Sequence, residues 1–287
     1  MRYAWVKDNR EAFPVERMCR VLQVSRSGFN QWSVRGPSRR QVENESLDAK
    51  VATIHEISER TYGRPRIVES LKAQGHQASP ERVRKSLQRQ GLRPIHKRPY
   101  RVTTDSDHTK PIAPNVLDRR FDGWAINQAW VADMTYIATD EGWLYLAAIL
   151  DLASRKIVGW SMNARMTKEL VCDALRSAYW ARKPTPGLIM HTDRGSQYAS
   201  GTYRALIGDF KMIQSMSRRA NCWDNSVMES FFKTLKVERA HRIRYATRDQ
   251  AKLDLVNWIE GRYNRSRLHS SIGYQSPVQK ELSLKAA

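Results

Sequence analysis

The sequence predicts an α/β domain with a mixed five-stranded sheet, preceded by a helical region. Between residues 121 and 240, short apolar segments of strand-like composition alternate with segments of helical periodicity, in the order βββαβαβα. Before residue 96 the periodicity is helical throughout. A polar, proline-rich stretch separates the two parts of the chain, as is typical of a linker.

These patterns divide the 287 residues into four regions. We expect a helical region over 1–95 with helix-turn-helix-like units at about 14–35 and 45–95, a linker over 96–120, a core over 121–240, and a basic helical tail over 241–287. Short arginine-rich helices joined by tight turns favour helix-turn-helix units. They fit a small helical bundle with a solvated basic face equally well, so both alternatives stay open.

Capping residues mark the helices of the first region. Pro14 is expected to begin a helix, because its fixed φ suits the first helical position. A helix from about Arg66 ends at Gly75. The last helix has Ser79 as its N-cap and Gly91 just after its end.

Alternating and continuous apolar runs predict the strands of the core, and 3.6-residue periodicity predicts its helices. Three strands with short connections should form an antiparallel meander: Trp130–Ile137, Trp143–Leu152 and Lys156–Met162. The elements expected next are a helix capped by Thr167, a strand Leu188–His191, a helix around Tyr203–Ile207, a strand Lys211–Met216 and a helix Asn225–Val237. Crossover helices after a meander place helices on both faces of the sheet.

Composition excludes several classes of protein. No run of about 18 apolar residues exists, so membrane spanning is not expected. The three widely spaced cysteines predict neither a disulfide framework nor a cysteine zinc site, and they fit a reducing cytoplasm. The net charge of +20 divides into +12 for residues 1–120, +3 for 121–240 and +5 for 241–287. A nearly balanced core with basic flanks favours a polyanionic partner, above all nucleic acid.

Three acidic residues occupy positions that indicate chemistry. Asp133 interrupts an apolar strand, where an unpaired carboxylate is costly. Asp193 follows the fourth predicted strand, and Glu229 lies on the last predicted helix of the core. If the first and fourth strands are neighbours, both aspartates reach one edge of the sheet, and the helix can bring Glu229 over it. Oxygen ligands without Cys or His suit Mg²⁺ or Mn²⁺.

At this point the chain resembles the transposases of the insertion sequence 3 family, within the retroviral-integrase superfamily. The similar segments are WVADMTYI, GWLYLAAILDLASRKIVGW, HTDRGSQYAS, NCWDNSVMESFFKTLKVE and YNRSRLHSSIGYQSP. The family's Asp, Asp, Glu triad falls on Asp133, Asp193 and Glu229, and the family's interval of 35 residues separates the last two. Ala132 and Trp223 stand where relatives often have Thr and Tyr, and neither replaces a ligand.

The resemblance implies a ribonuclease-H-like integrase core and an Asp-Asp-Glu transposase that acts in DNA transposition, integration and recombination. Two Mg²⁺ or Mn²⁺ ions per active site would stabilise the attacking and leaving oxygens. The implied partners are the terminal inverted repeats of the element, target DNA, further copies of the chain in a synaptic complex, and an upstream-frame protein as a fusion. The implied location is the bacterial cytoplasm, associated with the nucleoid and not with a membrane.

Three basic residues are candidates for contact with DNA. Lys233 and Lys236 follow Glu229 on the same helix face, where they would hold phosphates or terminal bases of the DNA end. The alternative for them is an ordinary solvated helix face. Arg194 follows Asp193, and a structural ion pair is as good an interpretation for it as phosphate binding.

Other candidates have weaker patterns. We expect His191 to be a packed strand residue and Asp151 to be a structural or outer-shell carboxylate. The constellation of a tyrosine recombinase is matched only superficially by Arg262 and Tyr263 with Arg265, Arg267 and His269. In such an enzyme the arginines and the histidine come from distant parts of the chain, whereas here they crowd one helix end. A DNA-binding regulator with an inactive core is the alternative from another class, but the intact acidic triad does not favour it.

Overall fold

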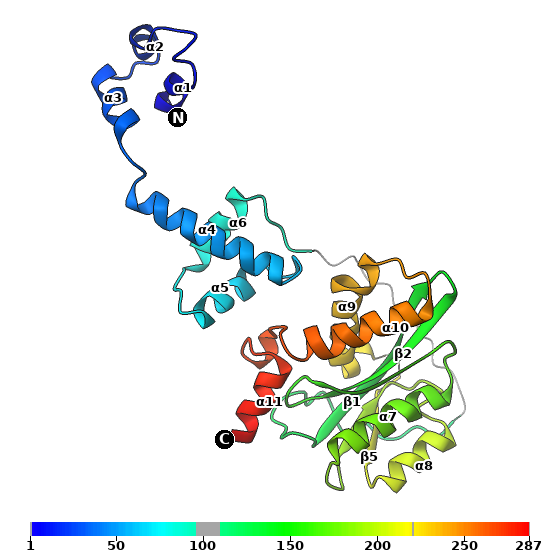
Figure 1. The fold of residues 1–287 in the computed structure, drawn as a ribbon. Coiled ribbons are helices and arrows are strands. Elements are labelled where there is room, and N and C mark those ends of the chain that lie inside the picture. The colour runs from blue at the N-terminus through cyan, green and yellow to red at the C-terminus, as the bar shows by residue number, and fades with distance from the viewer. Residues whose placement is uncertain (1, 96–109, 220, 287) are drawn as a thin grey trace.

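The computed structural model describes residues 2–95, 110–219 and 221–286. Six helices come first: α1 Arg2–Asp8, α2 Val15–Val21, α3 Arg26–Val34, α4 Arg39–Ile57, α5 Arg64–Ala73 and α6 Pro80–Arg89. Figure 1 shows them as two groups, with α1–α3 apart and α4–α6 next to the rest of the molecule. None of the described helices is long and apolar enough to cross a membrane.

Each helical group has its own small apolar core. In α1–α3 the core contains Val6, Met18, Cys19 and Phe29. In α4–α6 it is larger and includes Val51, Ile67, Leu71 and Val83, all of them fully buried. The predicted N-cap Ser79 accepts a hydrogen bond from a backbone N–H of the helix that follows, and Ser25 and Ser38, which were not predicted as caps, do the same for α3 and α4.

Two of these helices differ from the sequence prediction. The sequence analysis did not anticipate α1, which packs against α2 and α3. The helix expected from about residue 45 begins earlier, at Arg39, because Ser38 caps it there. The sequence signal was weak at both places, since the apolar residues of α1 are consecutive and show no helical period, and residues 39–46 have almost no apolar side chains.

The sheet has five strands in the order β3-β2-β1-β4-β5. Its elements are β1 Ala129–Thr139, β2 Gly142–Asp151, β3 Ile157–Asn163, α7 Lys168–Arg182, β4 Ile189–Thr192, α8 Gly201–Asp209, β5 Ile213–Met216, η1 Cys222–Asn225 and α9 Ser226–Glu238. The first three strands are antiparallel, whereas β4 pairs with β1 and β5 with β4 in parallel. The predicted meander, crossovers and mixed five-stranded sheet are therefore confirmed.

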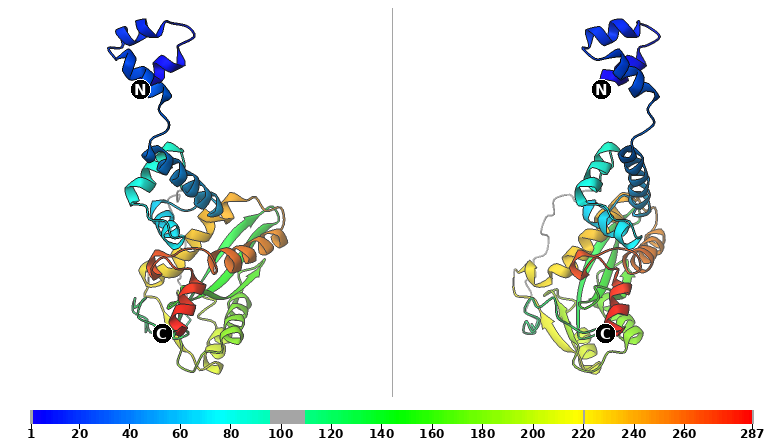
Figure 2. Two further views of the ribbon diagram at one scale, coloured as in Figure 1. Left: turned by 60° about the vertical axis from the view of Figure 1, so that its left-hand side comes forward. Right: turned by 90° about the vertical axis from the view of Figure 1, so that its left-hand side faces the viewer.

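Helices cover both faces of this sheet (Figures 1 and 2). On one face α7 and α8 close a core around Trp130, Leu175 and Met190. On the other face α9 packs on β1 together with the C-terminal part of the chain. Both cores are needed because the central strand β1 is buried on both sides along its first four residues.

The C-terminal region expected as a basic tail is integrated into the second core. Its elements are η2 Ala240–Arg242, α10 Arg248–Asn257, the π-helical turn η3 Trp258–Tyr263, η4 Ser270–Ile272 and α11 Pro277–Ala286. Tyr245, Leu255 and Ile259 are buried against the sheet side of α9. The Glu281 carboxylate anchors α11 by accepting a hydrogen bond from Arg182 at 2.7 Å. Basic side chains of this region thus project from a packed framework.

Part of the expected linker over 96–120 also packs on the core. Residues 96–109 lie outside the described residues. After them, Leu117 is fully buried in the second core, and the backbone N–H groups of Val116 and Leu117 donate to the Ser215 hydroxyl. Residues 110–120 form bends and a turn with no helix or strand, so their scattered apolar side chains show no periodicity.

Close packing between α7 and β3 makes Gly159 a sensitive position. A Cβ atom there would lie 2.5 Å from the Ala178 Cβ and 2.7 Å from the Ala174 carbonyl oxygen. We predict that Gly159→Ala lowers the free energy of unfolding by about 1–3 kcal/mol, because backbone atoms must move. Gly208→Ala is the control, since no atom lies within 4 Å of that Cβ. There the same change within a helix should stabilise by up to about 1 kcal/mol. Equal effects in denaturant titrations would contradict the prediction.

Candidate active site

Two carboxylates meet where β1 and β4 run side by side. The strands are parallel, and Ala132 of β1 is paired with Thr192 of β4. Asp133 and Asp193 are the next residues, so both lie at the same edge of the sheet. The structure thus brings together the two aspartates that the sequence indicated.

Together with burial, the proximity of these carboxylates raises the pKa of Asp133. Burial raises the pKa of Asp133 well above its ordinary value, and the negative charges of Asp193 and Glu229 raise it further. A hydrogen bond of 2.7 Å from the Met134 N–H and the positive charge of Lys236 act in the opposite direction. A positive ion beside Asp133 would relieve the repulsion, and the chain's own nearby ammonium group does so only in part.

A glycine lets the chain turn tightly around Asp193. The Gly195 N–H donates a hydrogen bond of 2.9 Å to the Asp193 Oδ1. A Cβ atom at position 195 would lie only 3.0 Å from that oxygen and 3.3 Å from the Gln197 Oε1. The close approach therefore depends on glycine, and it leaves the carboxylate of Asp193 held at the end of its strand.

Helix α9 brings the third acidic residue to this edge. Glu229 is in its first turn and is exposed to solvent. Met228, Phe231 and Leu235 anchor the helix in the second core. Burial raises the pKa of Glu229, whereas the positive charge of Lys233 lowers it.

The side chain of Asn225 ties the start of α9 to the strand that carries Asp133. Its Nδ2 donates to the Ala132 carbonyl oxygen at 3.1 Å. The sequence analysis did not identify this residue. Its position at the N-cap of a predicted helix is a signal that could have found it.

This donor set fits a hard divalent cation. Its members are carboxylate oxygens, and no cysteine or histidine side chain forms part of it. The buried repulsion between Asp133 and Asp193 is what such a cation would neutralise. Among the described residues, however, no group of three acidic, His or Cys side chains is close enough to form a complete metal site. Glu229 acts on Asp133 electrostatically from its own helix.

The three basic candidates have different surroundings. The Lys236 ammonium lies 4.6 Å from the centre of the Tyr136 ring, and burial lowers its pKa while Asp133 raises it. Lys233 is exposed one turn earlier on α9. The Arg194 Nε donates to the Ser217 carbonyl oxygen at 2.6 Å, which gives this side chain a structural contact. Lys236 is thus the candidate that the fold holds beside the aspartates.

His191 and Asp151 have structural surroundings, as expected. The ring nitrogens of His191 lie 2.8 Å and 3.2 Å from the hydroxyl oxygens of Ser215 and Ser217. Burial lowers the pKa of His191 to about 4, so the ring is neutral at pH 7. Asp151 is fully buried and accepts hydrogen bonds from the backbone of Asn127 and from Ser154.

The arginine, tyrosine and histidine of the tyrosine-recombinase alternative do not form an accessible site. Tyr263 is only 3% exposed and packs edge-on against the Phe231 ring. Arg267 forms a buried ion pair with Glu238 at 2.7 Å. Burial and, to a smaller extent, the positive charges of nearby arginines lower the pKa of His269 to about 2. A nucleophilic tyrosine must reach DNA, so this arrangement favours a structural role.

Asp224 fixes the loop in front of α9, and the sequence analysis missed it. It is fully buried and accepts hydrogen bonds from Asn115 at 3.0 Å, Arg119 at 2.8 Å and the Arg218 Nη2 at 2.7 Å. The hydrogen bonds from Arg218 hold the pKa of this carboxyl far below its ordinary value. Two separate segments are therefore joined to the loop that leads to Glu229.

We predict that Asp224→Ala lowers the free energy of unfolding by about 2–3 kcal/mol, because hydrogen bonds to a charged group are lost. The depressed pKa means that Asp224 stabilises the fold above pH 4, and that its contribution disappears as the pH falls further. Asp118→Ala is the control, since Asp118 is 68% exposed and pairs with the same Arg218 at 3.4 Å. Equal losses for the two variants at pH 7, in chemical denaturation, would refute the structural role of Asp224.

Family models match most of the chain. Residues 125–222 and 211–277 match models described as integrase core domain, and residues 41–100 match a model described as HTH-like domain. The chain also has similarity to solved structures at low identity. One is in the simian T-cell lymphotropic virus intasome in complex with a PP2A regulatory subunit (14% identity, TM-score 0.46, 80% of this chain and 74% of that one). Another is the HTLV-2 integrase catalytic core with magnesium (15%, TM-score 0.43, 56% and 99%).

Two curated relatives are much more similar. Over 283 residues the chain is 42% identical to the transposase InsF for insertion sequence IS3A of Escherichia coli K12, which covers 98% of both proteins. Over 261 residues it is 44% identical to an uncharacterized 31 kDa protein of insertion element IS600 from Shigella sonnei, covering 91% of this chain and 96% of that protein. The ribonuclease-H-like integrase core implied by the sequence motifs is thereby confirmed. The chain belongs to the insertion sequence 3 (IS3) family of transposases, with an integrase catalytic core and an HTH-like region.

Proposed function

We propose that this transposase cuts DNA at the ends of its element and joins them to target DNA in a metal-dependent reaction, with Asp133, Asp193 and Glu229 as metal ligands. The observation that supports this most is the pair of aspartates that follow the last paired residues of the parallel strands β1 and β4, where burial and the charge of Asp193 raise the pKa of Asp133. Burying two negatively charged carboxylates side by side costs folding free energy unless a cation binds to them.

The chemistry follows from the ligand set. Two Mg²⁺ or Mn²⁺ ions would supply Lewis acidity to the attacking and leaving oxygens of a phosphodiester. Asp133, Asp193 and Glu229 would hold these ions. The β1–β4 pairing and the Gly195 turn keep the aspartates in place, and the anchored start of α9 keeps Glu229 within electrostatic range of Asp133.

The reaction would have two steps of the same kind. Water first attacks a phosphodiester at the end of the element, and the bond between phosphorus and the 3′ oxygen breaks, which frees a 3′-OH. That hydroxyl then attacks a phosphodiester of target DNA, and a new bond replaces the one that breaks. Neither step needs a protein nucleophile, so the chain's contribution is ligation of the metal and alignment of DNA.

The basic flanks would hold the DNA. We assign end binding to Lys233, Lys236 and Arg194, and duplex binding to the helical region over 1–95 with its units at about 14–35 and 45–95. The exposed Arg82 and Lys85 of α6 support this assignment, because the second helix of a helix-turn-helix pair enters the major groove. The partners of the transposase would be the terminal repeats of the element, target DNA, further copies of the chain in a synaptic complex and an upstream-frame protein as a fusion. It would act in the bacterial cytoplasm, at the nucleoid.

We predict that Asp133→Asn, Asp193→Asn and Glu229→Gln each lower cleavage and strand transfer by a factor of at least ~10², because even outer-shell partners of metal ligands cost ~10–100-fold. Each change keeps the side-chain volume, so DNA binding should stay near wild type. Asp209→Asn on exposed α8 is the matched control and should be fully active. Near-normal Mg²⁺-dependent joining by any of the three variants would remove that residue from the ligand set.

We predict that Lys233→Ala with Lys236→Ala weakens binding to the DNA end by about 1–3 kcal/mol, as expected for charge-assisted contacts. Lys211→Ala with Lys252→Ala removes the same charge from distant exposed positions and should have a smaller effect. The measurement is DNA-end affinity across a salt series, together with metal titration, which should be unchanged. If both double variants show the same affinity and salt slope, these lysines belong to an ordinary solvated face.

A further inference from the structure

The HTH-like unit α4–α6 is docked on the far end of the helix that carries Glu229. Figures 1 and 2 show this unit against the end of α9 and the C-terminal segment, whereas α1–α3 stands apart from both. The two sides of this contact come from sequence segments that match separate family models, over 41–100 and 211–277. The contact thus joins a DNA-binding type of module to a catalytic one.

Apolar packing forms one half of the contact. Leu268 of the C-terminal segment packs against the apolar core of α4–α6. The Tyr62 hydroxyl accepts a hydrogen bond of 2.8 Å from the Leu268 N–H and donates one of 3.3 Å to the Ser266 carbonyl oxygen. Tyr62 is only 4% exposed. Because Leu268 completes the apolar core of α4–α6, this contact is a packed interface within the fold.

Two arginines enclose the Tyr62 ring. The guanidinium carbons of Arg66 and Arg262 lie 5.4 Å and 5.3 Å from its centre. The Arg66 Nε donates to the Leu268 carbonyl oxygen at 2.9 Å, and the Arg262 Nη2 donates to the Ser58 carbonyl oxygen at 3.0 Å. Each arginine therefore forms a hydrogen bond across the interface in addition to its stacking contact.

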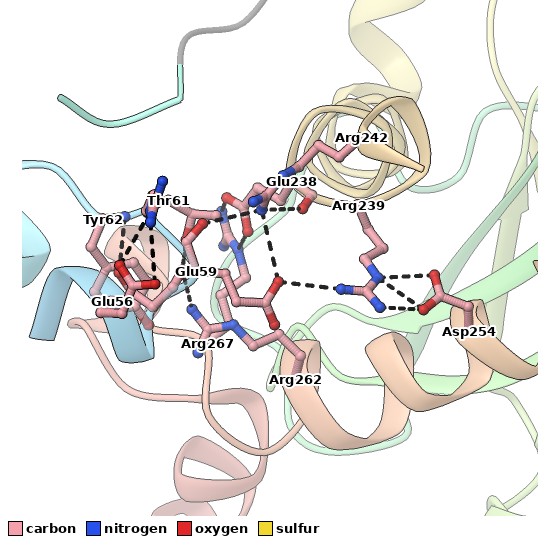
Figure 3. A network of polar contacts seen from close by, with 12 residues as sticks. Glu56, Glu59, Thr61, Tyr62, Glu238, Arg239, Arg242, Asp254, Arg262 and Arg267 are labelled. Carbon is pink, nitrogen blue, oxygen red and sulfur yellow. Dashed lines mark hydrogen bonds and ion pairs between the residues drawn. The ribbon is translucent and has the colours of Figure 1, made fainter. Parts of the chain in front are cut away.

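An ion-pair network forms the other half (Figure 3). The Glu59 Oε2 lies 3.5 Å from Arg239 and 3.8 Å from Arg242, and the Arg242 Nη1 also donates to the Glu59 carbonyl oxygen at 3.1 Å. Asp254 of α10 accepts hydrogen bonds of 2.9 Å and 3.0 Å from the Arg239 Nε. Glu59 therefore contacts arginines that the catalytic module already holds in place.

The backbone at Glu59 is held in an uncommon conformation. Glu59 and Arg60 have φ values of 55° and 62°, in the left-handed region that side chains other than glycine seldom occupy. Their carbonyl oxygens accept hydrogen bonds from Arg242 and from the Ile95 N–H at 3.1 Å each. Surrounding contacts thus fix the turn that presents Glu59 to α9.

The docked helix links this interface to the acidic site. Glu238, in the last turn of α9, forms a buried ion pair with Arg267. This pair holds the segment whose Leu268 packs against α4–α6. Glu238 is nine positions further along the helix than Glu229, which is a distance of about 14 Å at 1.5 Å per residue. A duplex bound to α4–α6 would therefore have a fixed position relative to the acidic edge.

We propose that this docking contact sets which phosphodiester is cut, with Glu59 and Tyr62 as positioning residues; the proposal rests on the function proposed above. Metal ligands cannot distinguish among chemically identical phosphates along a strand. A DNA-binding unit rigidly mounted on α9 can, because it fixes the distance from its bound sequence to the site. Loss of docking should therefore change where and how fast DNA is cut, more than how tightly it binds.

The test compares Glu59→Lys with Glu56→Lys in the full chain. Glu56 lies in the last turn of α4, three positions before Glu59, and its carboxylate contacts Arg60 of its own unit, so the control has the same charge change without a loss across the interface. Both variants are assayed with Mg²⁺ on labelled duplexes of the element end, with products mapped to the nucleotide. Duplex affinity and the distance between labels on α6 and α10 are measured in parallel.

For Glu59→Lys we expect duplex affinity within about twofold of the control and a broader distribution of distances between the labels on α6 and α10. Cleavage should be at least tenfold slower, and the cuts should spread over neighbouring phosphates. The Glu56→Lys variant should cut at the wild-type phosphate. Tyr62→Phe, which keeps the ring between its arginines but loses the hydroxyl, should spread the cuts to a smaller extent. A merely stabilising contact would lower the melting temperature without moving the cut.

Two outcomes would overturn the proposal. Cleavage by Glu59→Lys at the control's rate and position would show that docking does not select the phosphate. Cleavage by Glu59→Lys that is faster than that of the wild type would show that the docking contact inhibits the reaction. Failure of the proposed function is distinguishable, because wild type and Glu56→Lys would then also fail to cut. In that case an unchanged label distance in Glu59→Lys would still refute the role of Glu59 in docking.

Discussion

The parallel pairing of β1 with β4 is the constraint on which the rest of the structure depends. It places the carboxylates of Asp133 and Asp193 side by side where this pairing ends, and burial together with the charge of Asp193 raises the pKa of Asp133. Neutral residues at these two positions would avoid this cost. Its presence explains why so many neighbouring groups are arranged around this edge, among them the Gly195 turn, the Asn225 side chain and the Lys236 ammonium.

Helix α9 connects this edge with the helical region. Its first turn bears Glu229, its apolar face packs into the second core, and its last turn carries Glu238 in a buried ion pair with Arg267. Because a helix is stiff over this length, the groups at its two ends keep their separation. Recognition of DNA at one end and chemistry at the other can thus share one rigid element.

The acidic residues outside the site explain how a chain with net charge +20 stays folded. Asp224, Asp254 and Glu281 each lie among basic side chains, and ion pairs hold these groups at fixed places in the framework. Burial raises the pKa of Glu281, but hydrogen bonds from Arg182 and Lys285 outweigh it and lower the pKa to about 2. Basic residues thus serve two purposes, since some join segments of the chain and others remain exposed toward a polyanion.

The sequence by itself determined the order of strands and helices, because periodicity and caps are local signals. It also determined the family and indicated the acidic triad, because the motifs and the 35-residue interval are written along the chain. Only the tertiary structure decided that β1 lies beside β4 and which C-terminal residues enter the second core. It also decided that Glu59 contacts Arg239 and Arg242 just after α9, and that Tyr62 contacts the segment of Ser266 and Leu268. The residues of these contacts are up to about 200 positions apart, and such pairings leave no local pattern because they depend on how the elements pack.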